Sequence, residues 1–492
     1  MTRFTKIKEV ANSTVSLYLC HQTNLMMHFD FQNNDTICAL STAPGMAAIA
    51  VLRISGEKTF EIVNKVFRAK SKHFSIDNAQ SHKAWFGSIF DGEEMLDEVL
   101  VTIFRKPHSY TGEDIAEISC HGSVYIQQQL FGLIMKNGAR PATAGEFTMR
   151  GFAHQRFDLA QAEAVADLIA SNSKTTHELA IKQMRGGFSD KISMLRQGLV
   201  DFASLIELEL DFAEEDVEFA DRNEFYRLLH EIQTEIKVLT DSFQTGNVIK
   251  TGIPVAIIGK PNVGKSTLLN AILNEEKAIV SEIPGTTRDV IEDTIIIEGY
   301  NFRFIDTAGL RDSEDIIENM GIERTYEKIK QASIILYVCD LASCKGESAE
   351  EMLEEFRSFI QDENKHFILI GNKIDMMDEI PGHFSEMVEL ETIFVSAKRK
   401  ENIQLIADSL VKSVKKLNLN ADTIVSNARH YHALSKASEA LHAVEKNFRE
   451  GLPTDLIAID IRSALHYLGS ITGQIVTEEL LQNIFGKFCI GK

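Results

Sequence analysis

The sequence predicts a multidomain protein: an α+β domain, then an α-helical domain into which a parallel α/β domain is inserted. Its 492 residues are too many for one compact core, so about three domains are expected. Short β-rich runs come first, helical periodicity follows, and buried strands then alternate with helical stretches. Helical periodicity returns after the α/β segment. An inserted domain explains this order, since insertion is tolerated where chain ends lie close together.

Changes in composition set the expected domain boundaries. Residues 1–33 are polar and weakly periodic, which indicates a disordered tail or an upstream extension before a later start. Residues 34–152 form the N-terminal α+β domain, and residues 153–250 form the first part of the helical domain. Residues 251–417 form the α/β domain, and residues 418–492 form the second helical part.

Individual elements follow from hydrophobic patterns. The runs TICALST, AAIAVLRIS, EVLVTIFR and IAEISCHGS predict strands in the first domain, and VYIQQQLFGLIMKNG predicts a helix. Asp158 and Gln161 have the spacing of a capping box at the start of the next helix. The runs IPVAIIGK, NFRFIDT, SIILYVCD, HFILIGN and TIFVSA predict buried strands of the α/β domain.

Composition narrows the classes of function. A formal charge of −20 argues against broad, non-specific nucleic-acid binding, so an RNA contact would need a local basic patch or a partner protein. The six cysteines lack the short paired spacings of a zinc site and fit a reducing, cytoplasmic compartment. Among them, Cys489 is expected to be a buried free thiol. No apolar run approaches the ~20 residues of a membrane helix, so no membrane association is expected.

The segment GKPNVGKS, Gly259 to Ser266, matches the phosphate-binding loop pattern G-x-x-x-x-G-K-[ST]. It follows a predicted strand and precedes the helical TLLNAILN, which is the context that the pattern requires. Backbone N–H groups of such a loop and the following helix N-terminus form an anion cradle. Lys265 is expected to reach the β- and γ-phosphates, and Ser266 to ligate Mg²⁺.

Two later motifs indicate guanine. In GNKID, Asp375 would accept hydrogen bonds from guanine N1–H and its exocyclic amine, and adenine offers neither donor. The segment SAK, Ser396 to Lys398, would supply a backbone donor to guanine O6 and an aliphatic stem over the base. Together with the phosphate loop and Asp306 at a strand end, these motifs predict a GTPase.

The two remaining GTPase segments leave questions open. In GTTRD, Gly285 to Asp289, either Thr286 or Thr287 could meet Mg²⁺ on composition alone. In FIDTAGLRD, Leu310 follows the glycine where many small GTPases have a glutamine that orients the attacking water. A leucine side chain cannot form that hydrogen bond, so another group must align the water.

The motifs GKPNVGKS, GTTRD, DTAGL, NKID and SAK, with the final FCIGK, resemble the MnmE (TrmE) family of tRNA-modifying GTPases. The resemblance extends from about Asn34 to Lys492 and includes VLRISG, SYTGEDIAEISCHGS, AGEFTMRGF and FDLAQAEAVADLI. It implies that the first domain is similar to folate-binding domains and binds 5-formyl-tetrahydrofolate or a related tetrahydrofolate. The implied folate contacts are Arg53, Glu117, Arg156, where the family often has lysine, and Lys492.

The resemblance also implies which groups act in place of the glutamine that Leu310 replaces. A K⁺ ion would take the place of an arginine finger, held by Asn262 and by the loop residues Ser281, Ile283 and Thr286. Thr287 would then join Ser266 at Mg²⁺, and Glu318 would orient the attacking water through a second water molecule. The implied GTP-binding residues are Asn262, Val263, Gly264, Lys265, Ser266, Thr267, Ser281, Glu282, Ile283, Pro284, Gly285, Thr286, Thr287, Asp306, Thr307, Ala308, Gly309, Asn372, Lys373, Ile374, Asp375, Ser396, Ala397 and Lys398.

Partners are also implied by the resemblance. The family forms a homodimer and a heterotetramer with two subunits of the flavin enzyme MnmG (GidA). Together they add a carboxymethylaminomethyl or aminomethyl group to C5 of the wobble uridine of certain tRNAs. Two rival interpretations are a ribosome-assembly GTPase switch and a one-carbon transfer enzyme with a regulatory GTPase. A single phosphate loop and the lack of a basic GXXG module make the ribosomal one the weaker interpretation.

Overall fold

The computed structural model describes residues 35–72, 74–211, 222–275, 293–305, 329–341, 356–362, 365–377, 390–416 and 424–492. The predicted tail, residues 1–33, lies outside these ranges. Internal contacts divide the chain into two compact units. The first comprises residues up to Ala166 with Gln183–Thr234 and Ala433–Lys492, and the second comprises Asp167–Lys182 and Glu235–His432. The structure is therefore multidomain, as predicted, while the individual domain boundaries stay predictions.

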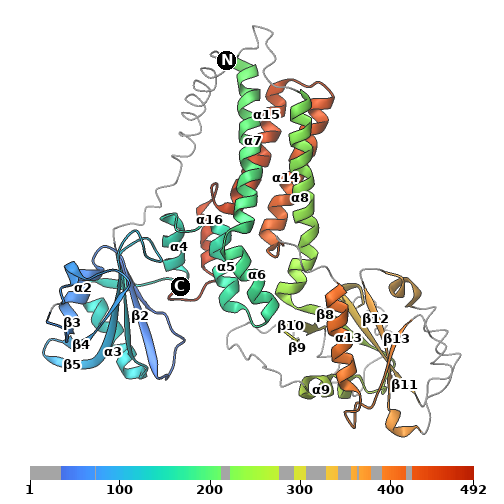
Figure 1. Cartoon of the computed structure of the whole chain (residues 1–492), viewed down its shortest axis with the longest axis horizontal. Helices are drawn as coiled ribbons and strands as arrows, with labels where there is room; N and C mark the ends of the chain where they lie inside the picture. The colour runs from blue at the N-terminus through green and yellow to red at the C-terminus, as the bar shows by residue number, and fades with distance from the viewer. Residues whose placement is uncertain are drawn as a thin grey trace. The chain divides into compact units, whose positions relative to one another are not determined.

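A seven-stranded sheet in the order β3-β4-β5-β6-β2-β1-β7 forms the N-terminal part of the first unit (Figure 1). Its neighbouring strands are antiparallel, except that β7 pairs parallel with β1. The strands are β1 (Thr36–Leu40), β2 (Ile49–Ser55), β3 (Phe67–Ala69), β4 (Lys83–Asp91), β5 (Glu94–Phe104), β6 (Ile115–His121) and β7 (Ala139–Pro141). The helices are α2 (Thr59–Val66), α3 (Val124–Lys136) and α4 (Glu146–Ala153), with a 3₁₀ turn at Ile76–Asn78.

The two faces of this sheet differ. Apolar residues of α2 and α3, among them Ile62 and Leu130, pack with alternate strand residues such as Val101 and form one core. The opposite face of the strands leaves large apolar side chains exposed, including Ile49 at 63% and Leu100 at 47%. Period-two alternation thus places the core on the helix side and leaves an apolar face open.

The helical segments precede and follow the α/β domain in the chain. They are α5 (Leu159–Ala170), α6 (Lys174–Met184), α7 (Gly187–Asp211), α8 (Arg222–Thr251), α14 (Ala428–Arg449), α15 (Thr454–Thr472) and α16 (Glu478–Phe485). The predicted capping box is confirmed. Asp158 N–H donates to Gln161 Oε1 at 3.0 Å, and Gln161 N–H donates to Asp158 Oδ1 at 2.8 Å.

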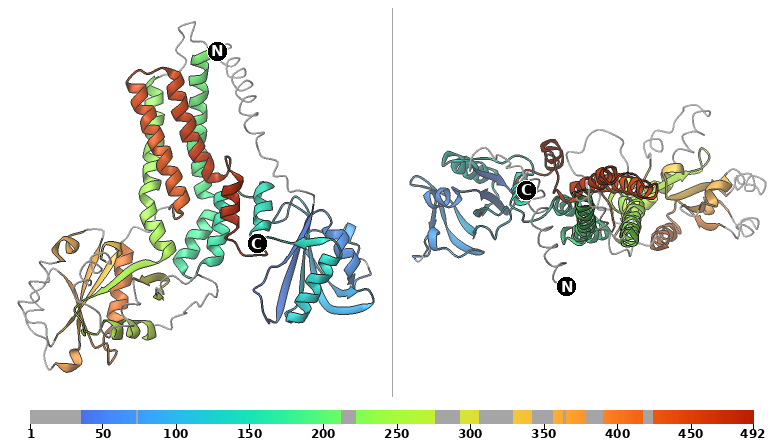
Figure 2. Two further views of the ribbon diagram at one scale, coloured as in Figure 1. Left: turned by 180° about the vertical axis from the view of Figure 1, so that it is seen from behind. Right: turned by 90° about the horizontal axis from the view of Figure 1, so that it is seen from above.

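Helices from the two segments pack together in the first unit. Helices α7 and α15 run side by side (Figures 1 and 2). Gly469 of α15 lies beside Arg196 of α7, and a Cβ on the glycine would be in ordinary van der Waals contact, 3.4 Å from Arg196 Nε. The Tyr226 ring also meets the Phe448 ring edge-on, with centroids 5.3 Å apart.

The second unit contains a six-stranded sheet in the order β13-β12-β11-β8-β10-β9. Its strands are β8 (Ile253–Ile258), β9 (Asp293–Ile297), β10 (Tyr300–Phe304), β11 (Ile334–Asp340), β12 (His366–Asn372) and β13 (Glu391–Val395). The five predicted strands are parallel to one another, whereas the edge strand β9 pairs antiparallel with β10 and was not predicted.

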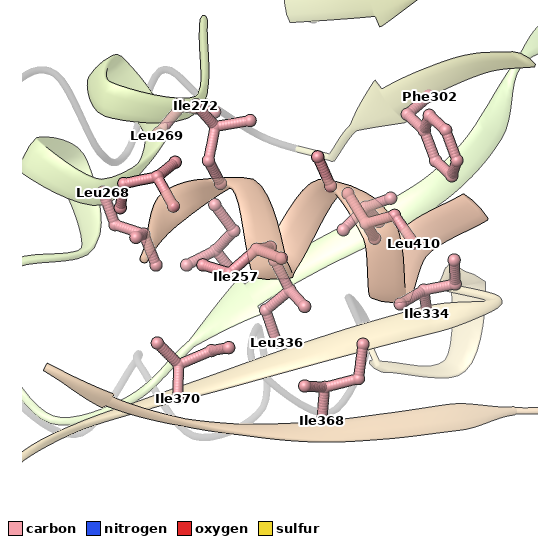
Figure 3. Packing of buried hydrophobic residues seen from close by; sticks show 14 of the residues in the cluster. Ile257, Leu268, Leu269, Ile272, Phe302, Ile334, Leu336, Ile368, Ile370 and Leu410 are labelled. Atoms are coloured by element: carbon pink, nitrogen blue, oxygen red, sulfur yellow. The ribbon is translucent and has the colours of Figure 1, made fainter. Parts of the chain in front are cut away.

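Helices α9 (Lys265–Glu275) and α13 (Ile403–Lys416) cover one face of this sheet. Figure 3 shows Leu268 and Leu410 of these helices with Ile257, Leu336 and Ile370 of the strands. All five side chains are buried. This core fixes the carboxyl ends of β8, β12 and β13, the edge of a parallel sheet where ligands bind.

Candidate functional site

The phosphate loop joins β8 to α9. Gly259 has φ +144, and a Cβ there would lie 2.2 Å from Val338 O of β11. Gly264 has φ +97, and its Cβ would lie 2.4 Å from Asn372 Nδ2. Asn262 adopts the left-handed conformation with φ +64, which asparagine tolerates better than most residues. The loop geometry therefore needs the residue types that the motif contains.

Lys265 is the first residue of α9. Its Nζ donates to the carbonyl oxygens of Gly259 and Lys260, each at 2.8 Å. These bonds bring the ammonium group back over the loop from the helix that follows it. A positive charge at this position complements the phosphate groups that such a loop binds.

Asn372, at the end of β12, joins the phosphate loop to the SAK segment. Its Nδ2 donates to Val263 O at 2.8 Å, and its Oδ1 accepts from Ala397 N–H at 3.0 Å. The side chain is only 2% exposed, so both bonds are shielded from water. Asn372 thus fixes the distance between the phosphate end and the base end of the site.

Lys373 adds a second connection. Its backbone is left-handed, with φ +68, and its Nζ donates to Asn262 O at 3.1 Å. The same Nζ lies 2.8 Å from Asp340 Oδ2, at the end of β11. The sequence pattern did not predict Asp340 as a site residue. Its position at the carboxyl end of a predicted strand could have indicated a site residue, but the sequence does not show that Lys373 pairs with it.

Asp375 and Ser396 form the base end. The Ser396 hydroxyl donates to Asp375 Oδ1 at 2.7 Å and itself accepts the Arg399 N–H at 3.1 Å. The hydrogen bond from Ser396 lowers the pKa of Asp375, with Arg399 and Lys398 adding to the effect. The carboxyl is therefore held ionised, the form that accepts hydrogen bonds from guanine N–H groups.

The structure thus brings the phosphate loop, GNKID and SAK together at one sheet edge. The remaining GTP-site predictions lie outside the described residues: they are Ser281, Glu282, Ile283, Pro284, Gly285, Thr286, Thr287, Asp306, Thr307, Ala308, Gly309 and the water-orienting Glu318. All three further K⁺ ligands and the second Mg²⁺ ligand are among them. These assignments stay predictions.

A second polar cluster lies on the N-terminal sheet, where Arg53 of β2 faces Glu117 of β6. Arg53 Nε donates to Glu117 Oε1 at 2.9 Å, and Nη2 lies 2.8 Å from the same oxygen. The guanidinium carbon is 5.4 Å from the Tyr110 ring centroid and 5.6 Å from that of Phe147. With Arg53 16% exposed and Glu117 26% exposed, the pair is partly buried rather than fully on the surface.

The C-terminal residues return to this cluster. Gly491 O accepts from Ser41 Oγ at 3.2 Å and from Arg53 Nη1 at 3.4 Å. Ile490 forms an isolated antiparallel bridge with Ala144. The motif CIGK is therefore held beside Arg53 although the two are far apart in sequence. The structure thus brings Arg53, Glu117 and the chain end at Lys492 into one region.

Arg156 and Cys489 are the two other residues of this region for which the sequence made a prediction. Arg156 is exposed, and its Nε donates to Ser109 O at 2.9 Å, next to Tyr110. The expectation for Cys489 is wrong, because its side chain is exposed rather than buried. Phe488 before it is buried, whereas Ile490 after it is 65% exposed, so the segment turns both Cys489 and Ile490 outward as it passes Ala144.

The parallel sheet, the glycine cradle and the ionised Asp375 define the protein as a P-loop GTP hydrolase. Residues 36–156 match the family described as "GTP-binding protein TrmE N-terminus", and residues 159–489 match "MnmE helical domain". The chain belongs to the MnmE family. No helix in the described ranges is long and apolar enough to cross a membrane.

Relatives cover almost the whole chain. The protein named tRNA modification GTPase MnmE of Christiangramia forsetii is 50% identical over 474 residues, covering 93% of this chain and 99% of the relative. Its namesake in Flavobacterium psychrophilum is 51% identical over 462 residues, with 93% and 99% covered. A solved G domain of the T. maritima FeoB iron transporter is 26% identical, with a TM-score of 0.24, covering 33% of this chain and 98% of that one.

Proposed function

We propose that the protein is a K⁺-dependent GTPase that modifies the wobble uridine of certain tRNAs together with an MnmG (GidA) partner. It uses a tetrahydrofolate one-carbon unit to add a carboxymethylaminomethyl or aminomethyl group at C5. The observation that carries the proposal is that one chain holds two sites of different chemistry. One contains the guanine-reading Asp375, and the other contains Arg53, Glu117 and the C-terminal carbonyl of Gly491.

Two cations fit the phosphate loop. Ser266, at the start of α9, offers a hydroxyl to Mg²⁺, with Thr287 as the second proposed ligand. Asn262, whose backbone is in the left-handed conformation, offers a side-chain oxygen to K⁺. When bound, K⁺ would supply positive charge to the phosphates undergoing transfer, the role that an arginine finger has in other GTPases. Glu318 is the proposed water-positioning residue in place of the missing glutamine.

The N-terminal cluster fits a folate. Glu117 offers an acceptor and Arg53 a donor, and the Arg53 guanidinium lies against the aromatic rings of Tyr110 and Phe147. Flat, polar ring systems are held by such a combination of apolar surface and a few convergent polar groups. Lys492 at the chain end and Arg156 are the proposed cations for the acidic part of 5-formyl-tetrahydrofolate.

The open face of the N-terminal sheet supports a homodimer. Ile49, Phe86 and Leu100 on β2, β4 and β5 are 63%, 43% and 47% exposed, and Leu100 is paired with Phe86 across the strands. Apolar side chains gathered on one sheet face mark an interaction surface. We propose a second copy there. We also propose a heterotetramer with MnmG, which fits the net charge of −20 because the partner can supply the basic surface for tRNA.

Packing between helices also supports the inserted arrangement. Residues before the α/β domain, such as Gln233, bond with residues after it, such as Leu441, whose carbonyl lies 3.4 Å from Gln233 Nε2. We therefore propose one helical domain, residues 153–250 with 418–492, around an α/β domain of residues 251–417.

Nucleoside analysis of tRNA tests the modification directly. Cells lacking the gene should accumulate wobble uridine without the C5 group, and the wild-type gene should restore it. A Glu318→Ala gene should fail to restore it and should lower GTP turnover about 10²- to 10⁴-fold, as expected for a water-positioning group. Glu314→Ala is the matched control. Normal tRNA nucleosides in the deletion strain would refute the proposal and would favour a ribosome-assembly switch.

A further inference from the structure

The tip of the β9–β10 hairpin meets the first turn of helix α6, and both the tip and this turn lie in the second unit. Gly299 O accepts two hydrogen bonds from Thr175, one from its backbone N–H at 3.3 Å and one from its hydroxyl at 3.2 Å. The hairpin tip thus supplies a carbonyl to a helix N-terminus, where N–H groups lack partners within the helix. The positive end of the helix dipole favours this oxygen.

This contact leaves little free space. Gly299 has φ +85, and a Cβ there would lie 2.9 Å from Lys174 Cβ. Glu298, the other turn residue, has φ +48, and its Oε2 lies 3.1 Å from Lys415 Nζ of α13. The hairpin tip therefore contacts α6 through the Gly299 carbonyl and α13 through an exposed ion pair.

The position of the hairpin in the chain gives the contact its consequence. GTTRD ends at Asp289, and β9 begins at Asp293. Strand β10 ends at Phe304, and DTAGL begins at Asp306. The hairpin is a paired unit that directly joins the two sequence segments expected to face the γ-phosphate. Because β9 and β10 are hydrogen-bonded to each other, a movement of GTTRD or DTAGL that shifts either strand also shifts the hairpin tip at Gly299.

Helix α6 can carry such a displacement further. It begins at Lys174 in the second unit and continues without a break to Met184, and the first unit resumes at Gln183. One route from the hairpin tip toward the first unit thus consists of the hydrogen-bonded contact at Thr175 followed by the continuous helix α6.

We propose that Thr175 is a positioning residue that couples GTP hydrolysis to helix α6 through the carbonyl of Gly299. The bound nucleotide changes the order of α6, and the Thr175 contact in turn favours the hairpin position needed for hydrolysis, because coupling between two sites is reciprocal. This inference rests on the GTPase activity and adds a regulatory role to it. It does not depend on tRNA, folate or MnmG.

The test compares Thr175→Val, which keeps the shape and loses the hydroxyl, with Thr175→Ser, which keeps the hydroxyl. Amide hydrogen exchange of the α6 peptide is measured in the full chain with GDP alone and with GDP plus aluminium fluoride. In the wild type and in Thr175→Ser, the α6 peptide should exchange at different rates with GDP alone and with GDP plus aluminium fluoride. Thr175→Val should lose this difference and lower kcat about 2- to 12-fold, the factor that one hydrogen bond is worth. Its GTP affinity should stay within about twofold.

Asp167→Asn is the matched control. Asp167 of α5 lies 2.7 Å from Lys250 of α8, a contact in the same unit that does not touch the hairpin. This variant should keep both the kcat and the nucleotide-dependent exchange. Equal exchange in both states of the wild type would overturn the inference, as would a wild-type kcat in Thr175→Val or an equal loss in Asp167→Asn. Failure of the tRNA experiment would leave this result standing, and the reverse also holds.

Discussion

Glu146 gives the sharpest stability test, because it lies at the centre of a buried ion cluster. Its side chain is 2% exposed and accepts from Arg140 Nη1 and Arg150 Nη2, each at 2.9 Å. Burial alone raises the pKa of Glu146, but hydrogen bonds from Arg140, the Thr143 N–H and Arg150 outweigh it and lower the pKa from 4.5 to about 2. This difference is worth about 3 kcal/mol of unfolding free energy at pH 7, at about 1.4 kcal/mol per pKa unit.

The sign of the pH dependence follows from the lowered pKa. A carboxyl that is more acidic in the folded state stabilises the protein fully above pH 4.5, and this contribution is lost as the pH falls toward 2. Glu146→Gln should therefore cost about 3 kcal/mol at pH 7, and the cost should shrink by about 1–2 kcal/mol at about pH 3.5. The reason is that at this pH the Glu146 carboxyl is mostly protonated in the unfolded wild type but still ionised in the folded protein, so folding must release a proton.

Trp85 provides the assay. It is the only tryptophan of the sequence and lies in β4, so its fluorescence during urea denaturation reports the N-terminal sheet. Glu61→Gln is the control, since Glu61 forms an exposed pair with Lys65 in the same domain and should show no measurable change. A loss below about 1 kcal/mol for Glu146→Gln, or an equal loss at both pH values, would refute the reasoning.

Three further predictions concern the nucleotide site. Gly264→Ala should weaken GTP binding about 10- to 100-fold in a fluorescent-analogue titration, because its Cβ would lie 2.4 Å from Asn372 Nδ2; unchanged affinity would contradict the loop geometry. Asp375→Asn should shift preference from GTP to XTP in competition assays, since the new amide can donate to the extra carbonyl of xanthine. Asn262→Ala should abolish K⁺ stimulation of hydrolysis while GTP still binds, whereas equal wild-type turnover in sodium and potassium buffers would exclude a K⁺ role.

The sequence correctly predicts those helices and strands whose hydrophobic or capping pattern is uninterrupted. Strands β8, β11 and β12 are continuous apolar runs, and the Asp158 box begins α5 where its spacing indicates. Strand β4 was missed because Gly87 interrupts it. That glycine is needed there, since a Cβ would lie 2.4 Å from Arg68 O of β3. A local pattern cannot show that a neighbouring strand approaches so closely.

The sequence predicts which residues belong to the nucleotide site, but it does not predict the hydrogen bonds that connect them. Motif spacing identifies Val263 and Asn372 as GTP-site residues, yet the bond between them spans 109 positions of sequence. Asp340 and Tyr110 were missed for the same reason, since each acts through a residue that only the fold brings near. Cys489 was wrongly expected to be buried because its exposure is decided by the bridge between Ile490 and Ala144.

The C-terminal segment offers the most specific test of the second site. Gly491 has φ +95, and a Cβ there would lie 2.3 Å from Leu40 O, so Gly491→Ala must move the chain end away from β1. The carbonyl that accepts from Ser41 and Arg53 would move with it.

Gly491→Ala should therefore weaken 5-formyl-tetrahydrofolate binding at least about tenfold in calorimetry, because strain of about 1–3 kcal/mol is relieved only by displacing that carbonyl. GTP turnover should not change, since the residues of the phosphate loop lie in the other unit. Gly451→Ala separates backbone strain from crowding. Gly451 also has a positive φ of +69, but a Cβ there would meet nothing within 4 Å. If Gly491→Ala bound the folate as tightly as wild type, or if Gly451→Ala lost as much affinity, the C-terminal carbonyl would have no part in the folate site.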